Sequence, residues 1–144
     1  MLSPTFFHER ALIKQGYHLI AGVDEVGCGA WAGPVYAAAV ILVPGRRLPG
    51  VRDSKTLSFE QRKNLSLLIQ KVCLAWSVGV STVEEIATLN IRRASLLATQ
   101  RALAGLSISP DWILSDAFPV PGSIPCTPII RGDSLSKSIA AASI

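Results

Sequence analysis

The sequence has few of the features that mark secreted, disulfide-bonded or membrane-spanning proteins. It contains three cysteines, an odd number at wide spacings, which argues for reduced thiols and against a disulfide framework or a zinc site. The longest apolar run, Val35 to Val43, is far shorter than the about 20 residues that a membrane span requires. No cationic segment precedes an apolar run at the N-terminus, so we expect no secretory signal. These absences predict a cytoplasmic protein with no membrane association.

Internal repeats, low-complexity segments and long linkers are also absent, and 144 residues fit one domain, 1–144. Hydrophobic residues make up 49% of the chain, which is ample for a packed core and argues against disorder. The formal net charge is +4. This charge is compatible with a polyanionic partner but gives it only weak support, because many soluble domains carry a similar charge.

The spacing of apolar residues predicts that helices and strands are interspersed along the chain. We expect strands at 17–23, 35–43, 74–81, 112–115 and 129–130, and helices at 4–15, 58–72, 91–103 and 138–144. Residues 82–85 are expected to cap a further short helix. The run 35–43 is continuously apolar, which predicts a strand buried on both faces. Trp31, Trp76 and Trp112 lie in or beside apolar runs, which favours packing in the core.

Four acidic residues stand at the ends of predicted strands or just before a predicted helix: Asp24, Glu25, Asp116 and Asp133. Strands that end at one rim of a sheet can bring such carboxylates together, although their mutual repulsion makes this costly unless a cation is bound. Ligand sets made only of oxygen favour Mg²⁺ or Mn²⁺. Two such ions about 3.5–4 Å apart can activate a water and stabilise the leaving oxygen of a phosphodiester.

Each of these acids also has a plainer interpretation. An aspartate at a strand end is usually a solvated turn residue or a helix N-cap, and capping explains Asp133 as well as metal binding does. Taken as an isolated pair, Asp24 and Glu25 would more often be surface residues than metal ligands, because charged residues are mostly exposed. The pattern of acids alone leaves these alternatives open.

The tripeptide Gly27-Cys28-Gly29 follows the first two acids almost directly. Glycines on both sides of one residue allow a tight turn and a close approach of the backbone to a ligand. Successive N–H groups there could form an anion-binding nest, although a plain turn between strands is the default interpretation. Beside a metal site, such a backbone could bind the ribose 2′-OH, the group that distinguishes RNA from DNA.

Segment 20–35, IAGVDEVGCGAWAGPV, closely resembles the opening motif of bacterial ribonuclease HII. Three further segments match that family in order. Residues 53–58 resemble its DSK-x-LS element, 114–116 the strand with the third acid, and 132–144 the GD…SIAAASI element with the fourth. The resemblance covers nearly the whole chain from Glu9 onward. It implies an α/β protein with the ribonuclease H-like fold, a mixed β-sheet flanked by helices.

The resemblance implies an endonuclease that hydrolyses the RNA strand of RNA–DNA hybrids and cuts 5′ to ribonucleotides embedded in duplex DNA. The products would carry 3′-hydroxyl and 5′-phosphate ends. Asp24, Glu25, Asp116 and Asp133 would be the catalytic acids and would bind two Mn²⁺ or Mg²⁺ ions. Substrate binding would involve Gly27, Cys28, Gly29 and Lys55, although Lys55 could equally be a solvated loop lysine. We expect a cytoplasmic monomer that serves DNA replication and repair.

Two departures from the family pattern affect this expectation. Cys28 stands where the family usually has arginine, so a cation that would face phosphate is missing. The family also continues beyond the helix that begins at Ser138, with a basic segment and a tyrosine that packs on the sugar at the RNA–DNA junction. We therefore expect a catalytic domain that is incomplete at its C-terminus.

Three alternatives to an active ribonuclease HII remain open at this stage. The first is a truncated, non-catalytic remnant that at most binds hybrids. The second is an unrelated metal phosphohydrolase with clustered acids, which the order of the motifs argues against. The third is the related ribonuclease HIII, which fits less well because its extra N-terminal domain has no counterpart before the first motif.

Overall fold

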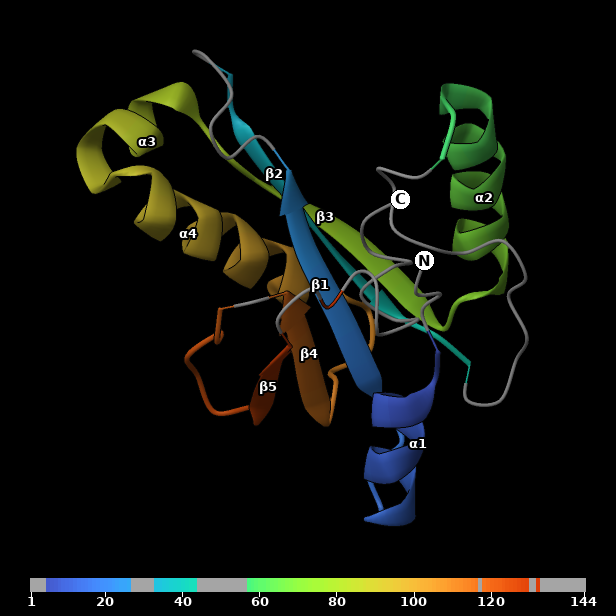
Figure 1. Ribbon diagram of the computed structural model, residues 1–144. Helices are drawn as coiled ribbons and strands as arrows, with labels where there is room; N and C mark the ends of the chain where they lie inside the picture. The colour runs from blue at the N-terminus through green and yellow to red at the C-terminus, as the bar shows by residue number, and fades with distance from the viewer. Residues whose placement is uncertain (1–4, 27–32, 44–56, 117, 130–131, 133–144) are drawn as a thin grey trace.

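The computed structural model describes residues 5–26, 33–43, 57–116, 118–129 and 132. Within these ranges the chain forms a five-stranded sheet with the strand order β3-β2-β1-β4-β5 (Figure 1). The strands are β1 (Ile20–Val26), β2 (Val35–Ile41), β3 (Ala75–Ser81), β4 (Trp112–Asp116) and β5 (Cys126–Ile129). The helices are α1 (Phe7–Lys14), α2 (Phe59–Val72), α3 (Val83–Leu89) and α4 (Ile91–Ala104).

The sheet is mixed, as expected. β1 pairs with β2 and β2 with β3 in antiparallel fashion, whereas β4 runs parallel to β1 and β5 parallel to β4. One exposed joint aligns β1 with β4: the Asp111 carboxylate accepts hydrogen bonds of 3.1 Å from the backbone N–H groups of His18 and Leu19. Because Asp111 directly precedes β4 and these N–H groups directly precede β1, both strands start at the same level.

Helix α4 covers one face of the sheet (Figure 1), and small residues let it lie close. Its buried Ala98 and Ala102 pack against Val23 of β1 and Ala37 of β2. In β3, a Cβ added at Gly79 would lie 2.1 Å from the backbone oxygen of Ala98, so glycine is needed at this crossing. This close packing fixes the position of α4 on the sheet, near the ends of the central strands.

Helices α1 and α2 pack on the opposite face. Ile69 of α2 is buried against Val40 and Leu42, and Leu12 of α1 against Ile20 and Leu114. Part of this face remains exposed. Its exposed apolar side chains are Tyr36 (48%), Trp76 (46%), Val78 (54%) and Val80 (36%), which lie on the paired strands β2 and β3.

Hydrogen bonds to side chains explain where the helices begin. Ser58 and Thr82 each form a complete capping box, in which their hydroxyls accept from the N–H of Gln61 and Glu85, and the Gln61 and Glu85 side chains accept from the N–H of Ser58 and Thr82. Asn90 joins α3 to α4 with a positive φ of 78°, and its side chain accepts from the N–H of Arg93. The helices predicted from residue 58 and from residues 82 and 91 are confirmed.

Other expectations need correction. β1 starts at Ile20 and continues through Asp24 and Glu25 to Val26 instead of ending at Val23, because β2 continues to pair with it. β5 begins at Cys126, three residues before the strand predicted at 129–130, and Pro128 is tolerated there because β5 is an edge strand.

Burial also differs from expectation at two aromatic residues. Strand β2 is not buried on both faces, since Tyr36 is half exposed, and Trp76 is likewise half exposed instead of lying in the core. Trp112 is partly buried as expected, with its ring centroid 4.7 Å from that of Tyr17 and its indole N–H donating to Thr127. Trp31 and the predicted helix 138–144 lie outside the described residues.

None of the helices in the described part of the chain combines the length and the apolar character needed to cross a membrane.

Candidate active site

The parallel pairing of β1 with β4 brings three of the predicted acids to one edge of the sheet. Val23 pairs with Ser115, so the residues that follow them, Asp24 and Asp116, lie beside each other where the pairing of β1 with β4 ends. Side chains alternate along a strand, so Asp24 and Asp116 share one side of the sheet while Glu25 starts from the other. Parallel strands whose carboxyl ends meet at one edge are a common setting for binding sites in α/β proteins.

Glu25 is electrostatically coupled to Asp116 despite starting from the other side. Burial of its carboxyl and, next, the negative charge of Asp116 raise the pKa of Glu25 above its ordinary value, whereas a side-chain hydrogen bond with Thr99 lowers it. The backbone N–H of Glu25 donates to the Asp24 carboxylate at 2.9 Å. Asp116 therefore disfavours the ionisation of Glu25, and a cation at this place would relieve that repulsion.

Asp116 is held by the chain that follows it. The backbone N–H of Gly132 donates to Asp116 Oδ1 at 2.9 Å, and the N–H of Phe118 donates to the Asp116 carbonyl at 2.8 Å. The Ser115 hydroxyl donates to the Phe118 carbonyl. The bond to Gly132 is informative, because it brings the residue directly before Asp133 to the carboxylate of Asp116.

The predicted site residues thus divide into two groups. Asp24, Glu25 and Asp116 lie at one edge of the sheet, on two neighbouring strands. Asp133, Gly27, Cys28, Gly29 and Lys55 lie outside the described residues. Over the ranges that the structure describes, no group of three or more His, Cys, Asp or Glu side chains is close enough to hold a metal ion. The four-carboxylate metal site therefore stays a prediction.

The donor set still suits a hard divalent cation. Carboxylate oxygens are the ligands that Mg²⁺ and Mn²⁺ prefer. Burial and then the charge of Asp116 raise the pKa of Glu25, so a cation between these two carboxylates would favour their ionised forms.

Thr99 contributes to this site, although it was not among the residues predicted from the sequence. Thr99 is buried in α4, and its hydroxyl also lies 3.1 Å from the Ser95 carbonyl. A signal was available in the sequence, since Ser95 and Thr99 are polar residues four positions apart on the otherwise apolar buried side of α4. Without the register between α4 and β1, that signal could not be assigned to the acids.

Comparison with known sequences identifies the family. The sequence profile described as Ribonuclease HII matches residues 21–144. The chain belongs to the ribonuclease HII family. Among curated family members, it is 53% identical over 137 residues to Ribonuclease HII of Moorella thermoacetica, an alignment that covers 94% of this chain and 66% of the relative. It is 51% identical over 143 residues to Ribonuclease HII of Koribacter versatilis, covering 99% of this chain and 56% of that protein. The chain thus spans less than two thirds of these ribonuclease HII relatives.

Comparison with solved structures supports the fold that this family implies. The crystal structure of ribonuclease H2 from Pyrococcus horikoshii OT3 superimposes with a TM-score of 0.75 at 24% identity, covering 86% of this chain and 68% of that one. Bst-RNase HIII in complex with Mn²⁺ gives a TM-score of 0.69 at 24% identity, covering 90% and 51%. At such low identity the similarity concerns the fold alone, and the expected ribonuclease H-like fold is confirmed.

Proposed function

We propose that this chain forms the catalytic part of an endonuclease that hydrolyses the RNA strand of RNA–DNA hybrids. Cleavage would also occur 5′ to ribonucleotides embedded in duplex DNA and leave 5′-phosphate and 3′-hydroxyl ends. The observation that carries this proposal is the placement of Asp24, Glu25 and Asp116 at one edge of the sheet in a ribonuclease HII-family chain. Hybrids and ribonucleotide-containing duplexes would be the partners of a cytoplasmic monomer.

Asp24, Glu25, Asp116 and Asp133 would hold two Mn²⁺ or Mg²⁺ ions. When bound, such a pair of ions would activate a water and stabilise the leaving oxygen. Support comes from the pKa of Glu25, which burial and then the charge of Asp116 raise, and from the Mn²⁺ complex of the structurally similar RNase HIII. The N–H of Gly132 would position Asp116 by its hydrogen bond to Oδ1.

The protein's own backbone would select the ribonucleotide. Gly27, Cys28 and Gly29 follow directly after β1, so their N–H groups would lie near the carboxylates and could bind the ribose 2′-OH. Lys55 would contact the nucleic acid backbone from the segment that precedes α2 in the sequence. Cys28 supplies no positive charge, so the selection would depend on the backbone of this tripeptide.

A cleavage assay tests the proposal. The longest chain that the natural reading frame encodes is incubated with Mn²⁺ or Mg²⁺ and a DNA duplex that contains one ribonucleotide, with an all-DNA duplex as the control substrate. We expect a single cut 5′ to the ribonucleotide and an intact control. Equal cutting of both duplexes would refute the proposal.

A second candidate is a remnant that binds hybrids without cutting them. Within the described ranges no group of three or more His, Cys, Asp or Glu side chains is close enough to hold a metal ion, which favours it. Preferential binding of a hybrid over a DNA duplex, together with no cleavage in either metal, would identify this function.

A further inference from the structure

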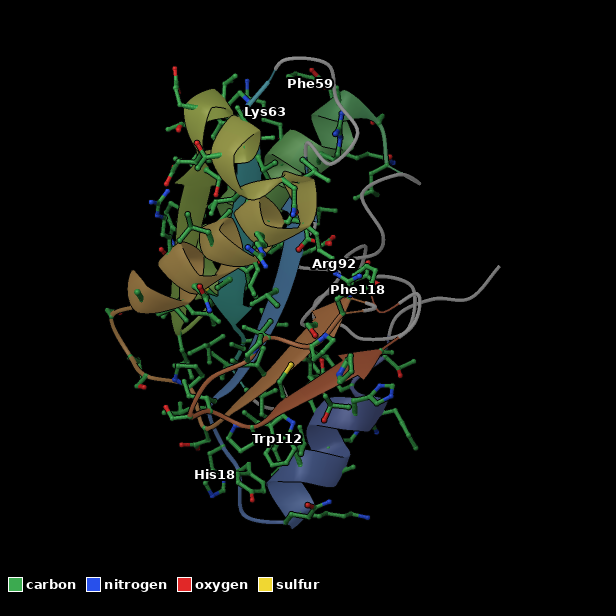
Figure 2. All side chains as sticks on the ribbon, turned by 90° about the vertical axis from the view of Figure 1, so that its left-hand side faces the viewer. His18, Phe59, Lys63, Arg92, Trp112 and Phe118 are labelled. Atoms are coloured by element: carbon green, nitrogen blue, oxygen red, sulfur yellow. The ribbon has the colours of Figure 1, made fainter. Side chains whose placement is uncertain are left out.

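Arg92 of α4 lies over the ring of Phe118, with its guanidinium carbon 4.5 Å from the ring centroid (Figure 2). Both side chains are exposed, and 53% of Phe118 is accessible to solvent. A phenylalanine exposed to this extent gains little from burial, so the contact with the cation explains its position better than core packing does.

The pair lies beside the carboxylate edge. Phe118 follows Asp116 by two positions, and its backbone is bonded to Asp116 and to Ser115. On α4, Arg92 precedes Thr99 by seven positions, which is about two turns, so both residues share one side of the helix. Since Thr99 interacts with Glu25, Arg92 lies on the side of α4 that faces this edge.

Among the described residues, Arg92 has no carboxylate partner that would give it a structural role. In the part of the chain that the structure describes, the arginine of α4 that forms an ion pair is Arg101, with Glu85, whereas Arg92 has no carboxylate within salt-bridge distance. An aromatic ring contacts a guanidinium through its flat face, and this leaves the N–H groups at the edge free to donate to an anion. A phosphate fits this planar set of donors.

A cation at this place would also meet an electrostatic need. The carboxylates of Asp24, Glu25 and Asp116 repel a polyanionic backbone, so a duplex that approaches them requires positive charge at the rim. Cys28 supplies none. Phe118 restricts the guanidinium beforehand, which lowers the entropy lost when a phosphate binds.

We propose that Arg92, held in place by Phe118, binds a backbone phosphate of the nucleic acid duplex beside the carboxylate edge. This inference rests on the proposed function, because it assumes that the substrate is a duplex containing RNA. It adds a phosphate contact and a supporting aromatic residue, neither of which the acidic site itself provides.

Equilibrium binding of a labelled RNA–DNA hybrid in EDTA, where cleavage is blocked, tests this contact over a range of salt concentrations. The proteins are the longest natural chain and its variants Arg92→Gln and Phe118→Leu. Arg93→Gln, the adjacent exposed arginine of α4, is the matched control. We expect Arg92→Gln to weaken binding roughly fivefold to tenfold and to reduce the slope of log K against log salt by about one.

The other variants separate the effect of the Phe118 ring on hybrid binding from the effect of the Arg92 charge. Phe118→Leu should weaken binding about twofold to fivefold without changing the salt slope, because the charge remains while its support is lost. Arg93→Gln should bind as the parent does, and Arg92→Lys should restore the slope. Thermal melting of each variant shows whether it is folded.

The outcomes distinguish this inference from the proposed function. If the parent protein binds the hybrid no better than a DNA duplex, the proposed function fails. If the parent binds the hybrid and Arg92→Gln binds equally well with the same salt slope, the inference is overturned and the function stands. Weaker binding with an unchanged slope and a lower melting temperature would also overturn it, because Arg92 would then act through folding.

Discussion

At the scale of single residues, the carboxylate edge contains an unfavourable interaction, because Glu25 is buried close to the negative charge of Asp116. Burial and Asp116 raise the pKa of Glu25, while the Thr99 side chain opposes this shift. Asp116 in turn receives a hydrogen bond from the Gly132 N–H. Acids kept together against their own repulsion at a strand end suggest selection for function more than for stability.

Neutralising Asp116 should therefore separate activity from stability. We expect Asp116→Asn to lower metal-dependent cleavage at least about 100-fold, the scale for losing a group that stabilises transition-state charge. The asparagine oxygen can still accept from the Gly132 N–H, and the repulsion with Glu25 disappears, so the melting temperature in metal-free buffer should not fall. The measurements are cleavage rates and thermal melting. A variant that cuts at the parental rate would contradict the role of Asp116.

Gly79 gives a second prediction at this scale. A Cβ there would meet backbone atoms of α4, at 2.1 Å from Ala98 O and 2.5 Å from Ala102 N, so Gly79→Ala must displace the helix. We expect a loss of about 1–3 kcal/mol in the free energy of unfolding, measured by urea denaturation. Because α4 carries Thr99 and Arg92, hybrid binding should weaken as well.

Gly105→Ala is the matched control for this experiment. Its added Cβ would meet the Ser77 hydroxyl at 2.3 Å, which is the end of a side chain that can rotate away. The loss of stability should therefore be smaller than for Gly79→Ala. Equal urea midpoints for the two variants would show that the contact between α4 and β3 can adjust.

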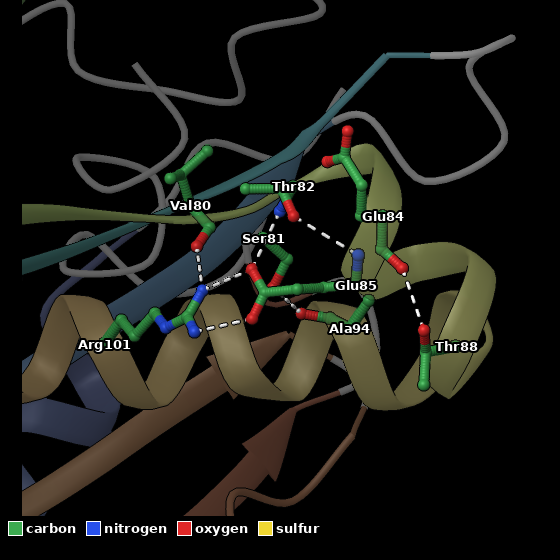
Figure 3. Close-up of polar contacts among 8 residues, drawn as sticks. All are labelled: Val80, Ser81, Thr82, Glu84, Glu85, Thr88, Ala94 and Arg101. Atoms are coloured by element: carbon green, nitrogen blue, oxygen red, sulfur yellow. Dashed lines mark hydrogen bonds and ion pairs between the residues drawn. The ribbon is translucent and has the colours of Figure 1, made fainter.

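At the scale of elements, one ion pair ties together α3, α4 and β3 (Figure 3). Arg101 of α4 donates to both carboxylate oxygens of Glu85 at 2.7 and 2.6 Å, and also to the Val80 carbonyl at 2.7 Å. Glu85 accepts from the Thr82 N–H as well, which completes the capping box of α3. These bonds, chiefly the one from Arg101, lower the pKa of Glu85 from 4.5 to about 2.

The stability that this ion pair contributes should depend on pH. The pKa of Glu85 is lower in the folded than in the unfolded protein, so its contribution is fully present above about pH 4.5 and is lost as the pH falls toward 2. We expect Glu85→Gln to melt at a lower temperature than the parent at neutral pH, with a difference that shrinks between these two values. The difference should be modest, because 44% of the Arg101 side chain and 27% of the Glu85 side chain are exposed. A difference that grew on acidification would contradict the assignment.

The elements also show what could be predicted from sequence and what could not. Helices α2 and α3 were predictable because Ser58 and Thr82 cap them through local contacts. The extension of β1 through Glu25 depends on pairing with Ala37 of β2, and β5 exists only because β4 offers it an edge. Such pairings join distant residues and leave little trace in local patterns.

At the scale of the whole molecule, the site depends on a long-range contact. Asp24 and Asp116 are 92 positions apart and meet because β4 pairs with β1 in parallel. The apolar pattern predicted both strands but not their adjacency, and only the family resemblance indicated that their acids belong together. Thr99 was missed for the same reason, because its importance arises only from the packing of α4 on β1.

The exposed apolar side chains of β2 and β3 lead to a prediction about the part of its relatives that this chain does not match. Tyr36 and Val80 are opposite one another in the sheet, as are Val40 and Trp76, and three of these four side chains are exposed. Large exposed apolar patches are rare on stable monomers and favour aggregation. The relative from Moorella thermoacetica matches this chain over only 66% of its own length.

We therefore expect that extending the chain after Ile144 by a C-terminal segment like that of the family raises the melting temperature and the cleavage of a duplex containing one ribonucleotide. The physical reason is that additional chain can bury part of this apolar face, which contributes roughly 25 cal/mol per Å² of apolar surface. Val78→Ser provides the control, because Val78 is 54% exposed in the 144-residue chain. The substitution should change the melting temperature little in the short chain and lower it in the extended one. Equal melting temperatures and equal cleavage by the short and extended proteins would show that the described domain is sufficient by itself.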